Sequence, residues 1–157
     1  IVLGGERSPN TTFMQVSGSG YRIASTKLQE VIDTSATLRG KLLAYIQAFL
    51  AQMSSTVLAN AHAKLEERLA RWLLMVHDRM DGNAISLTHE FLAIMLGVRR
   101  PGVTVAVHIL EGKGFIRANR GKIIVVNRLG LMDEAKGSYG AAEDEYHRLM
   151  GVKIRKT

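Results

Sequence analysis

Basic side chains are concentrated in one part of this chain. The 157 residues carry a net charge of +7, and the segment 98–128 alone holds seven basic residues against one acidic residue, Glu111. The seven are Arg99, Arg100, Lys113, Arg117, Arg120, Lys122 and Arg128. Such cations neutralise backbone phosphates, and guanidinium groups also pair with the edge of guanine. We expect this segment to bind a polyanion such as DNA; the alternative is a solvated basic surface without a partner.

The first two arginines lie between two predicted helices. In the segment Leu87–Leu110, Thr88 is a suitable N-cap for a helix that ends at Gly97, where glycine allows the chain to reverse. Pro101 suits the first turn of a second helix, because that position needs no backbone N–H. The residues of the second helix that should face inward are Val103, Val107 and Leu110. Two short helices joined by a glycine turn are typical of helix-turn-helix proteins that bind DNA.

A β-hairpin is predicted directly after these helices. Phe115–Arg117 and Lys122–Asn127 have the composition of strands, and Asn119–Gly121 between them suits a turn with positive φ. Ile85–Leu87, which precedes the first helix, is expected to pair with this hairpin as a short strand. A helix-turn-helix followed by a basic hairpin is the arrangement of a winged helix.

This block resembles the C-terminal DNA-binding domain of the Crp/Fnr family of bacterial transcription regulators. The matching stretches are LTHEFLAIMLGV, RRPGVTVAVHILEGKGFI and RGKIIVV, and their spacing agrees without a gap. The resemblance implies a mainly α (α+β) fold, in which a winged helix-turn-helix is preceded by a long dimerisation helix and remnant strands of a β-roll. It implies a sequence-specific transcription regulator that binds a pseudo-palindromic operator as a homodimer, under allosteric control of an N-terminal sensor domain. The alternative is a winged-helix protein-interaction module without specific DNA binding.

The resemblance divides the chain into three regions. Residues 1–32 correspond to the C-terminal remnant of a cyclic-nucleotide-binding-like β-roll, residues 33–62 to the dimerisation helix and hinge, and residues 63–157 to the winged-helix DNA-binding domain with a C-terminal extension. Because the first residue is not Met, we expect a fragment of a longer protein. Short strands are expected in the first region at Ile1–Leu3, Thr12–Val16 and Tyr21–Ala24.

Contacts to DNA can be predicted by role. The residues expected to read bases are Arg99, Arg100, Thr104, Val105 and His108, although His108 could equally be a solvent residue. The residues expected to bind phosphates are Thr88, His89, Lys113, Arg120 and Lys122. The resemblance places Arg100 at the first of three base-reading positions; the other two, Glu and Arg in the well-studied family pattern, are Pro101 and Val105 here. We therefore expect a different operator from that of the cyclic-AMP receptor protein.

One long helix is predicted over Thr34–Asn60. Its seam residues recur at alternating spacings of four and three: Leu38, Leu42, Tyr45, Phe49, Met53 and Thr56. About 27 residues of helix span roughly 40 Å, which is too long for the few preceding residues to cover. We expect the seam to be buried against a second copy of the chain, as the resemblance implies, rather than within its own subunit.

The next predicted helix, Lys64–Met80, is amphipathic. Its apolar face comprises Leu65, Leu69, Trp72, Leu73 and Val76, and Trp72 is expected in the core of the winged helix. Its polar face, expected in solvent, comprises Glu66, Glu67, Arg68, Arg71 and Arg79. After the hairpin we expect a short helix over Leu129–Ala135 and another over Glu143–Met150, which the resemblance assigns to a variable extension.

The sequence offers little evidence for a bound cofactor or for catalysis. Arg7 and Ser8 match part of a cyclic-nucleotide phosphate cassette, but we favour a surface turn over an effector site here, because the other pocket walls are missing from this sequence. We therefore expect no cofactor here, a cyclic nucleotide being the alternative. The chain contains no cysteine and no arrangement of residues typical of a metal site or an enzyme. We expect a cytoplasmic protein that does not enter the membrane and that contacts DNA, a second copy and RNA polymerase.

Overall fold

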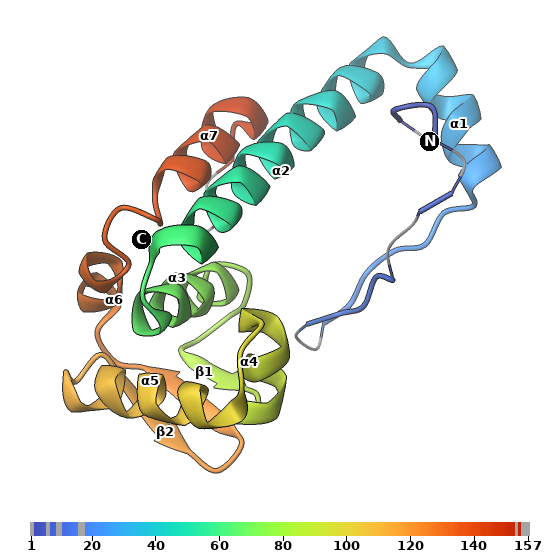
Figure 1. The fold of residues 1–157 in the computed structure, drawn as a ribbon. Coiled ribbons are helices and arrows are strands. Elements are labelled where there is room, and N and C mark those ends of the chain that lie inside the picture. The colour runs from blue at the N-terminus through green and yellow to red at the C-terminus, as the bar shows by residue number, and fades with distance from the viewer. Residues whose placement is uncertain (1, 6, 9–10, 16–17, 153, 155–157) are drawn as a thin grey trace.

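The computed structural model describes residues 2–5, 7–8, 11–15, 18–152 and 154, and its described part is mainly helical with one small sheet (Figure 1). The helices are α1 (Ser25–Thr34), α2 (Ala36–His62), α3 (Leu65–His77), α4 (His89–Leu96), α5 (Arg100–Gly112), α6 (Arg128–Glu134) and α7 (Ala141–Met150). The strands are β1 (Ala84–Ser86), β2 (Ile116–Asn119) and β3 (Lys122–Val125). The predicted fold class is confirmed in its mainly helical content and its winged helix-turn-helix.

The winged helix is built around α3, α5 and the sheet. The antiparallel sheet has the strand order β1-β3-β2, and Ile85 lies opposite Ile123, so the predicted third strand is present. Both isoleucines are buried, and the predicted inward residues of α5 are also buried. The core comprises Leu69, Leu73, Ile85, Leu92, Val103, Val107, Leu110 and Ile123. Trp72 packs at the edge of this core, half-buried, with its ring centroid 6.2 Å from that of Phe91.

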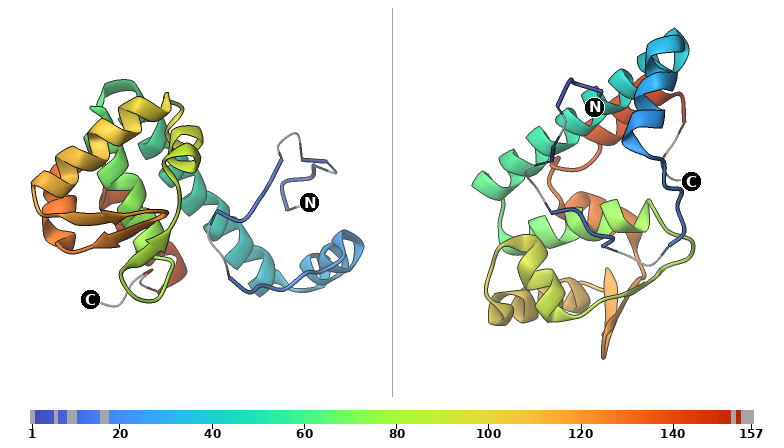
Figure 2. Two further views of the ribbon diagram at one scale, coloured as in Figure 1. Left: turned by 90° about the horizontal axis from the view of Figure 1, so that it is seen from below. Right: turned by 90° about the vertical axis from the view of Figure 1, so that its right-hand side faces the viewer.

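The long helix α2 projects away from the winged helix (Figures 1 and 2). Ser35 caps its N-terminus, because the Ser35 hydroxyl accepts from the backbone N–H of Leu38 at 3.2 Å. The helix ends at His62, and only Ala63 and Lys64 separate it from α3. By length and composition alone α2 could cross a membrane. The same criterion is met by helices that bury an apolar face against protein, and α7 lies alongside α2 (Figure 1).

The strands predicted in the first region are not formed by the described residues between 2 and 24. Phe13, Met14 and Ile23 are exposed there, and no described strand lies beside them to pair with their backbone. Isolated strands are at best marginally stable in water, so apolar composition without a pairing partner does not make a sheet. The ends of two predicted strands, Ile1 and Val16, lie outside the described residues. Lys27–Ile32, by contrast, has the pattern of a short helix, and it lies within α1.

Part of the predicted polar face of α3 is buried, contrary to the sequence prediction. Glu67 and Arg71 are only 6% and 3% exposed. Lys136 forms an ion pair with Glu67, and the carbonyl of Ser138 accepts from Nε of Arg71 at 2.7 Å. These partners lie 67 or more residues further along the chain, so helical periodicity could not reveal the cover.

Candidate nucleic-acid interface

The turn between α4 and α5 has the geometry of a helix-turn-helix. Thr88 caps α4, and its Oγ1 accepts from the backbone N–H of Phe91 at 3.1 Å. Gly97 ends the helix in the left-handed region, with φ of 63°, where a residue with a Cβ would be strained. The axes of α4 and α5 are bent by 103° at the break, within the range typical of the motif.

The predicted base-reading arginines lie at the exposed beginning of α5. Arg99 occupies the N-cap position in an extended conformation, and Pro101 lies in the first turn as predicted. The side chains of Arg99 and Arg100 are exposed and form no hydrogen bond or ion pair with the described residues. A guanidinium without an intramolecular partner is available to a ligand. Their roles in reading bases remain predictions.

The other predicted base-reading residues differ in their exposure and in their contacts with neighbouring side chains. Val105 is 59% exposed. Thr104 is half-buried, its hydroxyl lying 3.3 Å from the carbonyl of Arg100 and 3.1 Å from Nδ1 of His89. This contact joins a predicted phosphate ligand on α4 to a predicted base reader on α5, and sequence spacing gave no sign of it. His108 is 70% exposed at its side chain and lies 3.9 Å from a carboxylate oxygen of Glu111.

The wing presents further cations that have no partner in the described part of the chain. Gly121 makes the hairpin turn between β2 and β3 with φ of 71°, as the turn prediction requires. Arg117, Arg120 and Lys122 are exposed, and their side chains form no ion pair with the described part of the chain. Together with Arg99 and Arg100 they form one set of five, which we call the open cations.

The remaining two basic residues of the segment 98–128 are paired within the molecule. Lys113, predicted to bind phosphate, forms an ion pair of 2.6 Å with Glu134 of α6. Because Glu134 offsets the charge of Lys113, we expect the open cations to bind phosphates more strongly than Lys113 does. Arg128 donates to Asp78 at 2.7 Å, and the Asp78 side chain is only 2% exposed.

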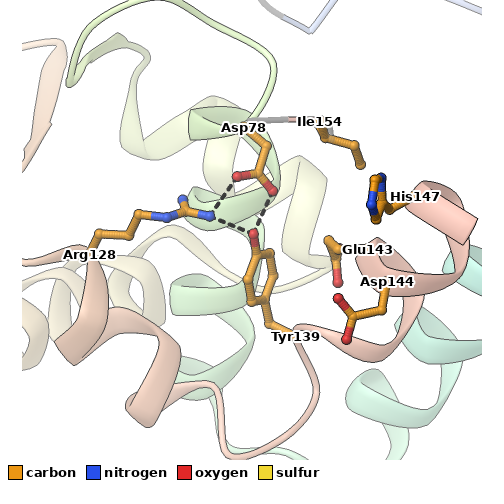
Figure 3. A pocket seen from close by; sticks show the side chains of 7 residues that line it. All are labelled: Asp78, Arg128, Tyr139, Glu143, Asp144, His147 and Ile154. Atoms are coloured by element: carbon orange, nitrogen blue, oxygen red, sulfur yellow. Dashed lines mark hydrogen bonds and ion pairs between the residues drawn. The ribbon is translucent and has the colours of Figure 1, made fainter. Parts of the chain in front are cut away.

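Figure 3 shows the polar network around Arg128, which the sequence did not reveal. Nη2 of Arg128 also donates to the hydroxyl of Tyr139 at 2.6 Å, and that hydroxyl donates to the other oxygen of Asp78 at 2.7 Å. Burial and the bond to Asp78 raise the pKa of Tyr139 above its ordinary value, so the phenol stays protonated. Nδ1 of His77 lies 3.2 Å from Arg128, which can only donate; the His77 proton therefore sits on Nε2, 2.8 Å from Oδ1 of Asn83. This network holds the fold together and does not face outward with the open cations.

The predicted effector residues lie apart from this surface. Arg7 and Ser8 are both exposed, in a part of the chain where the described residues form no strand. Their role in binding an effector therefore stays a prediction.

The predicted seam of α2 is open over much of its length. Tyr45, Phe49 and Met53 are each 47% exposed, and Leu50 and Val57, beside them, are 55% and 67% exposed. The other members, Leu38, Leu42 and Thr56, are half-buried. The residues of α2 that are buried, Ala48 and Ala59, lie on another face of the helix.

Comparison with known proteins agrees with this geometry. Residues 67–134 match the model of the Crp-like helix-turn-helix domain. The chain carries a Crp-like helix-turn-helix domain. The matched segment contains α4, α5 and the wing, and therefore all five open cations. Domains of this type occur in DNA-binding transcription regulators. The predicted resemblance to Crp/Fnr-type regulators is therefore confirmed.

Solved structures extend the similarity beyond the Crp-like domain. A CRP/FNR-family transcriptional regulator from Thermus thermophilus is 26% identical, with a TM-score of 0.51 over 57% of this chain and 49% of that one. A crp/fnr-family transcriptional regulator from Eubacterium rectale shares the fold at 20% identity, with a TM-score of 0.54 over 69% of this chain and 50% of that one. This chain thus spans about half the length of these solved relatives. No curated protein sequence matches it.

Proposed function

We propose that the chain is the DNA-reading part of a Crp/Fnr-type transcription regulator that acts as a homodimer. In this proposal α5 enters the major groove with Arg99 and Arg100 at its leading end, and the wing meets the flanking phosphates. The single observation that carries the proposal is the set of five open cations. These cations lie on the two elements that a winged helix presents to DNA, and the described residues leave them unpaired, so they are suited to a polyanionic partner.

The open seam of α2 supports a second copy as the other partner. Its large apolar side chains are exposed along several turns, at Tyr45, Phe49 and Met53, so the described chain leaves much of the seam uncovered. A coiled-coil-like contact between two such helices is two-fold symmetric. Two-fold symmetry predicts a pseudo-palindromic operator with half-sites about one helical turn, roughly 34 Å, apart.

The finer features of the proposal concern the operator and its regulation. Pro101 and Val105 cannot donate hydrogen bonds from their side chains, so the half-site differs from one read by Glu and Arg at these positions. A sensor domain, connected through α2, regulates the orientation of the recognition helices. The complete protein acts in the cytoplasm on promoters, where RNA polymerase is its further partner.

A salt titration tests the proposal directly. The binding constant for promoter DNA should fall with salt at a logarithmic slope of about −0.9 per phosphate neutralised, so five contacts give roughly −4.5 per protomer. Specific fragments should compete better than random duplex. A salt-insensitive constant, or no binding to any duplex, would favour the protein-interaction module instead. Light scattering at the same concentrations should give twice the monomer mass.

A further inference from the structure

The joint between α2 and α3 is short, and other segments of the chain contact both helices across it. Only Ala63 and Lys64 connect the two helices, and the N–H of Lys64 donates to Glu67 at 3.1 Å. A two-residue link leaves several backbone dihedral angles free to change the angle between the helices. That angle decides where α5 points relative to α2, so contacts that span the joint are structurally important.

On the α3 side, the bridge consists of three buried polar residues that share one face. Glu67, Arg71 and Asp78 follow at spacings of four and seven, which places them on one stripe of the helix. They are 6%, 3% and 5% exposed. The segment 135–139 covers all three in the same order along the chain. Lys136 pairs with Glu67, the carbonyl of Ser138 accepts from Arg71, and the Tyr139 hydroxyl donates to Asp78.

Burying these charged groups costs free energy unless specific partners compensate, and Arg71 shows this most clearly. Burial lowers the pKa of Arg71, while the carboxylate of Glu143 on α7 opposes that effect. Nη2 of Arg71 is buried without a hydrogen-bond partner among the described residues. Charged groups are buried only where partners compensate for lost hydration, and here the principal partners come from residues 136–143.

On the α2 side, α7 continues directly from that segment. Figures 1 and 2 show α7 lying along α2. The contact uses small side chains: Ala142 of α7 is 6% exposed, and Ala48 of α2 is 2% exposed. Both line the same small cavity with Tyr146. Two direct side-chain contacts also cross the joint, from Arg68 to Asn60 at 3.0 Å and from Arg79 to Gln52 at 2.6 Å, but both are exposed.

We propose that residues 135–150 are a brace that fixes the angle between α2 and the winged helix. Its first part is attached to α3 through buried polar contacts, and its second part is attached to α2 through close packing of small residues. Releasing α7 from α2 should therefore let the joint move while the winged helix keeps its fold. The proposal concerns the orientation of the parts and stands whether or not the surface of α5 binds DNA.

The absence of cysteine allows a direct measurement. Cysteines introduced by Lys41→Cys on α2 and Asn119→Cys at the tip of the wing, both exposed positions, carry spin labels whose separation reports the joint angle. Labelled chains are diluted with unlabelled chains, so that each assembly contains one labelled pair. Pulsed electron resonance without DNA should give one narrow distance distribution for the parent.

Two variants then release the brace. Ala142→Arg places a charged side chain in the α2–α7 contact, whereas His147→Arg places the same side chain at an exposed position of α7 and serves as the control. A chain that ends at Gly140 removes α7 but keeps the contacts of residues 136–139 with α3. Both releasing variants should broaden or shift the distribution, and the control should match the parent. Trypsin cleavage after Lys64 should rise about tenfold, because cleavage follows the open population.

The outcomes separate clearly. If both releasing variants keep the narrow distribution and the cleavage rate of the parent, the brace does not fix the angle and the proposal is wrong. A broad distribution in the parent itself would overturn it equally. Loss of DNA binding with an unchanged parent distribution would argue against the proposed function and leave the brace in place.

Discussion

The open cations and the buried polar contacts of the brace use the same residue types in opposite ways. Arg100 and Arg117 are exposed and have no partner among the described residues. Arg71 instead donates to the carbonyl of Ser138 and Arg128 to the carboxylate of Asp78, 67 and 50 residues distant in sequence. The first arrangement leaves charge for a ligand. The second uses charge to connect elements of the fold. Net charge alone cannot distinguish the two, and the pairing of each side chain does.

The largest expected effect comes from removing a paired arginine. Arg128→Ala leaves the carboxylate of Asp78 buried without its ion-pair partner, and breaking such a pair costs roughly 3–5 kcal/mol. The matched control, Arg117→Ala, removes an exposed cation and should change the free energy of unfolding by less than about 0.5 kcal/mol. Urea unfolding followed by Trp72 fluorescence measures both. Equal losses would contradict the distinction between the two groups.

The second prediction concerns the open seam. Met53→Glu places a charge in the proposed contact between copies, and the dimer dissociation constant should rise about a hundredfold, or roughly 2.7 kcal/mol. Gln47→Glu adds the same charge on an exposed position of α2 outside the seam and should leave the constant unchanged. Analytical ultracentrifugation across a concentration series distinguishes them. A dimer unaffected by Met53→Glu would place the interface elsewhere.

The third prediction tests an open cation. Arg100→Ala should weaken binding to the preferred operator by about 1–3 kcal/mol, the usual worth of a bidentate guanine contact, and should flatten the preference at one base pair. The free energy of unfolding should not change, because the side chain has no partner among the described residues. Arg148→Ala on α7 removes a cation paired with Glu145 and is the control for net charge. Unaltered selectivity in a competition assay would refute a base-reading role.

The smallest effect concerns pH. The hydrogen bond with Lys136 lowers the pKa of Glu67 below 4.5 and raises that of Lys136 above 10.5. The contribution of Glu67 to stability is therefore present above about pH 4.5 and is lost as the pH falls through its lowered pKa. The contribution of Lys136 is present below about pH 10.5 and is lost as the pH rises through its raised pKa.

Unfolding of the parent and of Glu67→Gln at several pH values measures this dependence. The difference in unfolding free energy should be constant between about pH 5 and pH 10 and should shrink at lower pH. A difference that did not shrink as the pH fell below 4.5 would mean that the carboxylate is not what Lys136 recognises.

Much of the winged helix could be predicted because its signals are local. The cap at Thr88, the reversal at Gly97 and the proline of the first turn lie within a few residues of the geometry that they produce. The exposed position of the arginines follows from the same spacing. Burial of Glu67 and Arg71 could not be predicted, since the covering segment is distant in sequence. The ion pair of Lys113 could not be predicted either, because its partner Glu134 lies 21 residues further along the chain.

The N-terminal region shows the opposite error. Apolar stretches at Thr12–Val16 and Tyr21–Ala24 have the composition of strands, but a strand needs neighbours for its backbone hydrogen bonds. The described residues supply none. Composition therefore predicted strands here, but without a neighbouring strand to pair with, the described residues form none.

By itself the sequence determined which segments become helices, where the recognition turn lies and where positive charge gathers, because caps, glycines and periodicity act over a few residues. The tertiary structure alone decided which charges are buried and which are paired within the molecule. Those outcomes depend on segments that meet only after the chain has folded, and on the requirement that every charge removed from water finds a partner.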